Sequence, residues 1–422
     1  MRSRLARQLL AFVVAFTVAI PLFRFFSWDG KSEQTKIGSA ANKKPRRSLI
    51  EKSVLLRYGD TDPLTIFSAY SHSDRTTVII AAYGYMMRRL FCRLFDDQFQ
   101  EILPATQSLV FPEFTIHCPP SNHARFVALS LNAFDAVTSQ DMHKIRAVRE
   151  SDSKGEKSFL SVCLAPLWGT SPKWLLLIEF IEYYRLQGVE YFYVYRQSSD
   201  TYSDIVLNDY ENEGILEIVN ISESTNCLKR HRCRHEIQLQ DCVFRTRGRS
   251  DWVATVDLDE RISVNGGSTV RQYIESHALP VNAELRFRCR WLLRLEEIPA
   301  DPIQWRVEDS RIPMDVWHNT SHVAPVNHTT KSIIQPLKVE SMGVHQVLRF
   351  SPGTTVRLVP PEHAVVRHYR LTKGWAYFLK EAETFGSFED TYVAPELLEA
   401  IQLAVNNKVN KLFPESKPKV LK

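Results

Sequence analysis

Residues Phe159 to Tyr195, FLSVCLAPLWGTSPKWLLLIEFIEYYRLQGVEYFYVY, contain the clearest secondary-structure pattern of the chain. Its two ends, residues 159–165 and 191–195, are apolar runs that predict strands. Between them Ser171 and Pro172 supply the N-cap and the first position of a helix, and Gly188 ends it. The apolar residues of this helix recur at helical spacing: Trp174, Leu177, Ile178, Ile181 and Tyr184. A strand-helix-strand unit of this kind favours parallel pairing of its strands.

The same alternation continues toward the C-terminus. The pattern predicts a helix over 205–212, a strand over 215–220, a helix over 234–247 and a strand over 252–256. We therefore expect an α/β fold with a mostly parallel sheet and flanking helices.

Other regions frame this α/β domain, which we place at residues 151–390. Short apolar runs alternate with turn signals over 62–150 and predict a smaller strand-rich subdomain. A charged stretch at 150–157 separates the two. Over 391–422 we expect an amphipathic helix at 395–412, followed by a basic tail.

The N-terminus predicts a membrane segment. A basic tail over residues 1–8 precedes an apolar run over 9–28 that is interrupted by Arg24. About twenty such residues can just span a bilayer if Arg24 snorkels. A cleaved signal peptide is the alternative, but no clear small-x-small site follows Ile20, so we favour a signal anchor. The polar, basic residues 29–61 read as a stem.

Composition and cysteines narrow the class of protein further. The 422 residues carry a formal net charge of only +5, which argues against a protein that binds nucleic acid by neutralising phosphates. All seven cysteines follow the apolar run, and some should form disulfides if that part faces an oxidising compartment. Sequons at Asn220, Asn319 and Asn327 are compatible with a glycoprotein.

The strongest chemical signal is the stretch from Trp252 to Glu260, WVATVDLDE. Open parallel sheets bind ligands beyond the carboxyl ends of their strands, which is where Asp257, Asp259 and Glu260 fall. Two carboxylates at i and i+2 can hold one divalent cation that bridges nucleotide phosphates. A bare D-x-D pattern also arises by chance, and a solvated turn at the strand end is the alternative interpretation.

Several blocks of the chain together resemble glycosyltransferase family 92, formerly a domain of unknown function. The resemblance covers residues 62–385 in the family's order and is carried by the following matches: Phe67-Ser-Ala-Tyr70 with Arg75, Cys163-Leu-Ala-Pro-Leu167, the helix from Trp174 to Tyr184, Gly188 to Tyr195, Gln240-Asp-Cys242, Trp252 with Asp257-Leu-Asp-Glu260, Lys331 with Pro336, Val339 to His345, and Arg367-His-Tyr-Arg370.

This resemblance implies a single-pass type II protein of the Golgi membrane, with a lumenal Rossmann-like domain of GT-A type. It implies an inverting transfer of galactose from UDP-galactose to a glycan on a glycoprotein or glycolipid, with Mn2+ or another divalent cation. If the family's roles are transferred to the matching residues, Asp257 and Asp259 bind the metal and the diphosphate, and Glu260 orients these two aspartates. Oligomeric state stays open.

The remaining site residues are expectations of the same kind. An inverting transfer needs a carboxylate base, for which Glu308 and Asp309 are candidates, although both also fit a solvated surface. His345 is a candidate third metal ligand or else a hydrogen-bonded core histidine. The nucleotide-sugar is expected to meet a cationic group: Lys331, Arg367, His368 and Arg370. A plain surface strand would also explain residues 367–370.

Competing interpretations remain for the whole chain and for two clusters. A catalytically silent carbohydrate-binding relative and a metal-dependent phosphoester hydrolase are the rival classes, the latter needing more clustered ligands. The group His231, Cys233 and His235, with Cys227, fits zinc chemistry, but disulfides are favoured there. The aromatic run over 191–195 is better explained by core packing than by ligand stacking.

Overall fold

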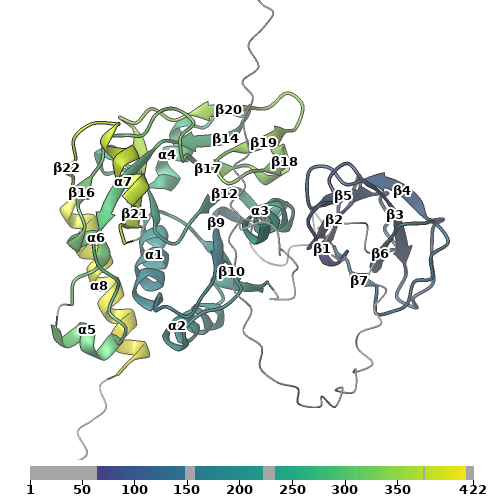
Figure 1. The fold of residues 1–422 in the computed structure, drawn as a ribbon, viewed down its shortest axis with the longest axis horizontal. Helices are drawn as coiled ribbons and strands as arrows, with labels where there is room; N and C mark the ends of the chain where they lie inside the picture. Colours follow the sequence, from purple (N-terminus) through teal and green to yellow (C-terminus); the bar gives the residue numbers. More distant parts are fainter. Residues whose placement is uncertain (1–63, 148–156, 222–232, 309, 374–375, 415–422) are drawn as a thin grey trace, which may run out of the picture. The chain divides into compact units, whose positions relative to one another are not determined.

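The computed structural model of the chain describes residues 64–147, 157–221, 233–308, 310–373 and 376–414 (Figure 1). The expected membrane segment at 9–28, the stem and the basic tail lie outside these residues. No helix among the described residues is long and apolar enough to cross a membrane.

The main α/β domain is built on a seven-stranded mixed sheet. Its strands, in spatial order, are β11 (Leu216–Asn220), β10 (Tyr191–Arg196), β9 (Ser158–Leu167), β12 (Ser250–Val256), β17 (Lys331–Ile334), β14 (Asn282–Phe287) and β20 (Thr355–Leu358). The first four strands pair in parallel, as the sequence predicts, and so do β14 and β20. Only β17 runs antiparallel to both of its neighbours.

The helices that connect the parallel strands cover both faces of this sheet. They are α1 (Trp174–Leu186), α2 (Thr201–Asn212) and α3 (Cys233–Thr246). Val162 of β9 packs into the hydrophobic core that α1 and α2 share, whereas the next residue, Cys163, packs into the core that contains α3. A strand buried on both faces explains why this part of the sequence is continuously apolar.

Helix α1 differs from its prediction at one end. It begins at Trp174 with Lys173 as N-cap, and no side chain caps it, so Ser171 and Pro172 are loop residues rather than the cap and first turn. The Lys173 ammonium group donates to the carbonyl of Ser171 at 2.7 Å and folds this loop back on itself. The predicted end is confirmed: Gly188 has a φ of 88°, which a side chain would strain.

A second, five-stranded sheet follows the first in the chain. Its order is β13 (Glu260–Val264), β21 (Ala364–Leu371), β15 (Cys289–Arg294), β16 (Asn319–Thr320) and β22 (Glu389–Asp390). The chain passes from β12 of the first sheet to β13 of the second through the turn at Asp257–Asp259. The expected metal motif therefore occupies the crossing point between two sheets.

Further elements complete this region. They are α4 (Val270–His277), α5 (Pro302–Glu308), α6 (Pro313–Val316), the hairpin β18 (Val339–Met342) with β19 (Val347–Phe350), α7 (Ala376–Glu383) and α8 (Pro395–Leu412). Helix α8 has the predicted bounds, and it packs beside α1 (Figure 1). Its Lys408 lies 2.9 Å from Asp209 and 2.8 Å from Glu213, which fastens α8 to the end of α2.

The strand-rich region forms two four-stranded sheets. One contains β5 (Thr115–Cys118), β2 (Thr76–Ile80), β1 (Ile66–Ser71) and β8 (Arg146–Ala147) in that order; the other contains β4 (Thr106–Leu109), β3 (Arg89–Phe95), β6 (Phe126–Ser130) and β7 (His143–Lys144). The disulfide between Cys92 and Cys118 lies within this region. Strands β1, β2, β5 and β6 coincide with the apolar runs at 64–70, 76–85, 109–118 and 125–134, whereas the prediction does not include the other four strands.

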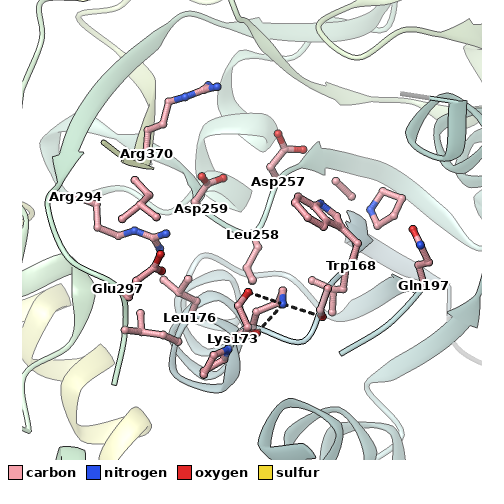
Figure 2. A pocket seen from close by; sticks show the side chains of 18 of the residues that line it. Trp168, Lys173, Leu176, Gln197, Asp257, Leu258, Asp259, Arg294, Glu297 and Arg370 are labelled. Carbon is pink, nitrogen blue, oxygen red and sulfur yellow. Dashed lines mark hydrogen bonds between the residues drawn. The ribbon is translucent and has the colours of Figure 1, made fainter. Parts of the chain in front are cut away.

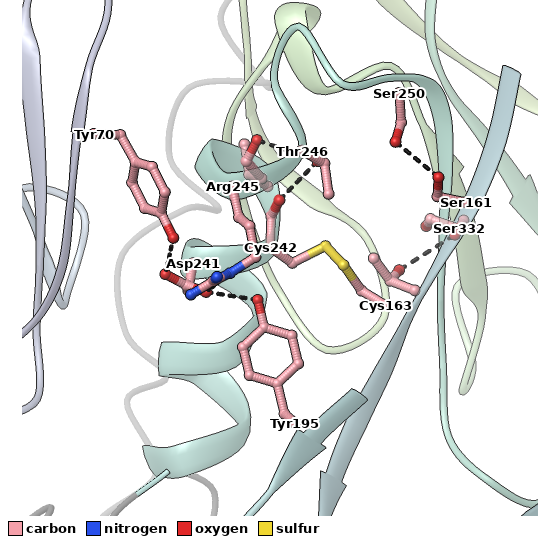
Figure 3. Close-up of a disulfide and its surroundings, with 12 residues drawn as sticks. Tyr70, Ser161, Cys163, Tyr195, Asp241, Cys242, Arg245, Thr246, Ser250 and Ser332 are labelled. Carbon is pink, nitrogen blue, oxygen red and sulfur yellow. Dashed lines mark hydrogen bonds and ion pairs between the residues drawn. A yellow bond between two sulfur atoms is a disulfide. The ribbon is translucent and has the colours of Figure 1, made fainter. Parts of the chain in front are cut away.

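A buried acid joins the strand-rich region to α3 (Figure 3). One oxygen of Asp241 accepts hydrogen bonds from the hydroxyl groups of Ser68 and Tyr70, and the other accepts from Tyr195 and Arg245. The neighbouring Cys242 forms a disulfide with Cys163 of β9. These two disulfides confirm that some cysteines pair; Cys289 is buried and free, and Cys227 lies outside the described residues.

Candidate active site

A cavity of about 800 Å3 opens at the carboxyl ends of β9, β10 and β12 (Figure 2). Its lining residues come from six segments of the chain: residues 165–176, Gln197, residues 234–235, residues 257–259, the segment with Arg294, Glu297 and Ile298, and the segment with His368, Arg370 and Leu371. Ligands bind at this edge of open α/β sheets. The indole of Trp168 is 70% exposed on this wall, so an aromatic face is available to a ligand.

Asp257 and Asp259 project into this cavity from the turn after β12 (Figure 2). Their side chains are 33% and 30% exposed, whereas Glu260 is 1% exposed. The Glu260 carboxylate accepts a hydrogen bond of 2.8 Å from the backbone N–H of Asp257, which closes the turn. Glu260 thus supports the turn, and the two aspartates remain open to a ligand.

Lys331 of β17 stands behind Asp257. Its ammonium group is 3.1 Å from Asp257 Oδ2 and 3.0 Å from Glu260 Oε2, and its side chain is 2% exposed. Burial alone would raise the pKa of Asp257, but Lys331, His235 and His368 together outweigh it and hold this pKa below its ordinary value. Lys331 therefore fixes an ionised Asp257 at the cavity wall.

His368 of β21 forms the corresponding ion pair with Asp259. It lies opposite Glu260 in the pairing of β13 with β21, with Nε2 3.3 Å from Asp259 Oδ2 and Nδ1 3.5 Å from Glu260 Oε1. Burial alone would lower the pKa of His368, yet Asp259 and Glu260 raise it well above its ordinary value. The imidazolium in turn holds the pKa of Asp259 low against the effect of burial.

The donor set fits a divalent cation that shares its ligands with a substrate. The described residues contain no group of three or more His, Cys, Asp or Glu side chains that could hold a metal alone. Asp257 Oδ1 is buried and has no hydrogen-bond partner among the described residues. One or two carboxylates, with diphosphate oxygens and water as the remaining ligands, are typical of cations that accompany nucleotides.

Cationic side chains surround the two aspartates. Arg294, at the end of β15, and Arg370, at the end of β21, both line the cavity (Figure 2). Burial lowers the pKa of Arg294, and Asp259 and Glu297 act against this shift. Arg294 Nε and Nη1 are buried without a hydrogen-bond partner among the described residues. Such donors suit an anionic ligand such as a diphosphate.

The structure brings only some of the expected site residues to the cavity. Arg367 points elsewhere, because its guanidinium group donates to the hydroxyl and the carbonyl oxygen of Thr391, each at 2.9 Å. His345 does not line the cavity; its Nδ1 lies 3.2 Å from the carbonyl of Thr330. The histidines beside the aspartates are His368 and His235 instead.

The two expected bases fall outside the side chains that the structure describes. Glu308 ends α5, with a side chain outside the described set, and Asp309 is not described. The wall instead contains Glu297, which follows β15 closely. An acidic pair directly after an apolar strand was a usable signal for it, the same kind of signal that identified Asp257.

The structure also places parts of the His/Cys group considered for zinc and of the aromatic run at 191–195. His235 lines the cavity with Nε2 3.8 Å from Asp257 Oδ1, whereas Cys227 and His231, of the weighed zinc group, lie outside the described residues. Tyr193 and Tyr195 are 3% and 0% exposed, and neither lines the cavity, so core packing explains the aromatic run.

The fold and the cavity define an α/β protein with two exposed carboxylates and several cationic side chains at the ligand-binding edge of its sheet. The family model described as "Glycosyltransferase family 92" matches residues 158–402, more than half of the chain. The chain therefore belongs to glycosyltransferase family 92, and the resemblance seen in the sequence is confirmed. No curated protein sequence matches it.

Solved structures give matches of low similarity. The mannosyltransferase PcManGT from Pyrobaculum calidifontis, in complex with GDP-Man and Mn2+, has a TM-score of 0.31 and 12% identity over 61% of this chain and 74% of that one. HddC from Yersinia pseudotuberculosis has a TM-score of 0.27 and 13% identity over 54% of this chain and 100% of that one. TarS residues 1–349 from S. aureus have a TM-score of 0.27 and 11% identity over 60% of this chain and 72% of that one. At these TM-scores the likeness carries no argument about this chain's ligands.

Proposed function

We propose that this glycosyltransferase moves galactose from UDP-galactose to a hydroxyl group of a glycan, with inversion and with a divalent cation, Mn2+ in our proposal. The observation that carries the proposal is the pair Asp257 and Asp259, which opens onto a cationic cavity at the carboxyl ends of parallel strands. Membership of family 92 supports the reaction class.

The side chains divide the work of donor binding. A divalent cation held by Asp257 and Asp259 would act as a Lewis acid on the diphosphate. Lys331 and His368 keep these two carboxylates ionised and fixed in position before the donor arrives. Arg294 and Arg370 supply positive charge to the departing nucleoside diphosphate.

UDP release from the purified full-length chain tests this proposal. The assay offers a panel of UDP-sugars and mixed glycan acceptors, with Mn2+ or with a chelator. We expect metal-dependent release from UDP-galactose and a product whose anomeric configuration, read by NMR, is inverted. Release from another UDP-sugar alone would reject the donor. The absence of both release and UDP binding would favour a silent carbohydrate-binding relative.

We also propose that the protein resides in the Golgi membrane, anchored by residues 9–28, with the catalytic domain in the lumen. The disulfides Cys92–Cys118 and Cys163–Cys242 support an oxidising compartment. Protease added to intact vesicles should leave the catalytic domain uncut until detergent is added. Cleavage without detergent would contradict this topology.

A further inference from the structure

The cavity wall holds three carboxylates within the described part of the chain: Asp257, Asp259 and Glu297. The first two have partners in Lys331 and His368 and face the expected diphosphate. An inverting transfer still needs a group that takes the proton of the acceptor hydroxyl. We propose that Glu297 is this general base, an inference that rests on the proposed function.

The backbone around Glu297 is fixed from both sides. The next residue, Ile298, is 6% exposed and belongs to the main hydrophobic core. The carbonyl of Pro299 accepts a hydrogen bond of 2.9 Å from the indole of Trp174 at the start of α1. On the other side, the carbonyl of Arg294 accepts a bond of 2.9 Å from the N–H of Thr372. An exposed side chain on a segment anchored in this way has a defined place at the cavity wall.

Arg294 connects this carboxylate to the metal motif. Its guanidinium group interacts electrostatically with both Asp259 and Glu297, and Figure 2 shows the three side chains on the same side of the cavity. Arg294 is 8% exposed, and its Nε and Nη1 have no hydrogen-bond partner among the described residues. These unpartnered donors suit the negative charge of a leaving diphosphate. Glu297 itself is exposed and lines the cavity.

Two bonds form and two bonds break in the proposed step. The acceptor hydroxyl gives its proton to a carboxylate oxygen of Glu297 while its oxygen forms a bond to the anomeric carbon of the donor sugar. The bond between that carbon and the diphosphate oxygen breaks, and its electron pair leaves with UDP. Arg294 and Arg370 lie where they can meet the new negative charge.

The test compares Glu297→Gln with Glu296→Gln in the full-length chain. Glu296 is the adjacent exposed carboxylate and does not line the cavity, so it is a matched control. Because a general base typically contributes about 10²–10⁴-fold, we expect kcat of E297Q to fall by this range, with E296Q unchanged. The affinity of E297Q for UDP with Mn2+, measured by calorimetry, should stay within about threefold of the parent, since a base acts on the acceptor and not on the donor.

Different outcomes separate the explanations. A loss of UDP affinity that accounts for the whole loss of rate would overturn the proposal, because Glu297 would then act only by positioning Arg294. Wild-type turnover in E297Q would also overturn it and leave the proposed transferase intact. In Glu297→Ala, added formate should restore part of the rate if the missing group is a base. A parent chain inactive with every donor and acceptor would instead count against the proposed function itself.

Discussion

Two acidic sites of this chain use the same residue type for opposite purposes. Asp241 is 0% exposed, and its two oxygens together accept four hydrogen bonds from Ser68, Tyr70, Tyr195 and Arg245 (Figure 3). Asp257, at the end of β12, is 33% exposed and keeps one oxygen without a hydrogen-bond partner among the described residues.

The difference shows how a structural acid can be told from a ligand-binding one. The positive charge of Arg245 and the hydrogen bonds hold the pKa of Asp241 below its ordinary value although burial acts in the other direction. A carboxylate saturated in this way stabilises the fold and has no oxygen left for a ligand. Asp257 and Asp259 are supported from behind and open in front, so the fold supplies their charge to the cavity.

The largest expected effect is a loss of turnover when one of the two cavity aspartates is replaced. Asp259→Asn should lower metal-dependent turnover by about 1000-fold, since a bound cation contributes several kcal/mol of charge stabilisation to the transition state. Its melting temperature should change by only a few degrees. The control is Asp251→Asn at the far end of β12, where the carboxylate pairs with Lys157 on the surface. A collapse of folding in the first variant would mean that Asp259 is structural.

Replacing the buried Asp241 should instead lower folding stability. Asp241→Ala leaves the buried Arg245 without its main partner, and breaking such a pair costs about 3–5 kcal/mol of folding free energy. Tyr70→Phe, which removes one hydrogen bond, should cost only about 1 kcal/mol. Denaturant unfolding followed by fluorescence measures both losses. Unchanged stability in Asp241→Ala would show that the comparison between the two acids is wrong.

Acidification should lower the folding stability of the chain through two histidines of the strand-rich region. Burial, together with Arg75 and Arg247, lowers the pKa of His72 and of His117 to about 4. Below pH 6.5 the unfolded chain therefore binds more protons at these sites than the folded one, and stability falls as the pH drops from 6.5 toward 4. The loss should approach about 3 kcal/mol for each histidine. Unfolding titrations across this range, with His117→Gln as comparison, should show a shallower slope in the variant.

Much of the architecture could be predicted because local patterns of apolar residues indicate the individual strands and helices. Alternating apolar runs and helical spacing gave the order from β9 to β12, and Pro395 with the apolar residues after it gave both ends of α8. The D-x-D motif was recognisable because the strand before it is continuously apolar. The start of α1 was missed because Lys173, not Ser171, precedes the first helical residue.

Local sequence patterns specify the order of elements from β9 to β12, helix α8, the position of Asp257 and Asp259 after a strand, and the resemblance to the family. Which distant residues meet the two aspartates depends on the tertiary structure. The pairing of β13 with β21 and of β12 with β17 places His368 and Lys331 beside the motif, while Arg367 faces Thr391 and His345 stays with Thr330. Glu297 likewise reaches the cavity through the position of β15. Local periodicity fixes each strand, but strand order and register, set by contacts far apart in the sequence, fix which side chains share a site.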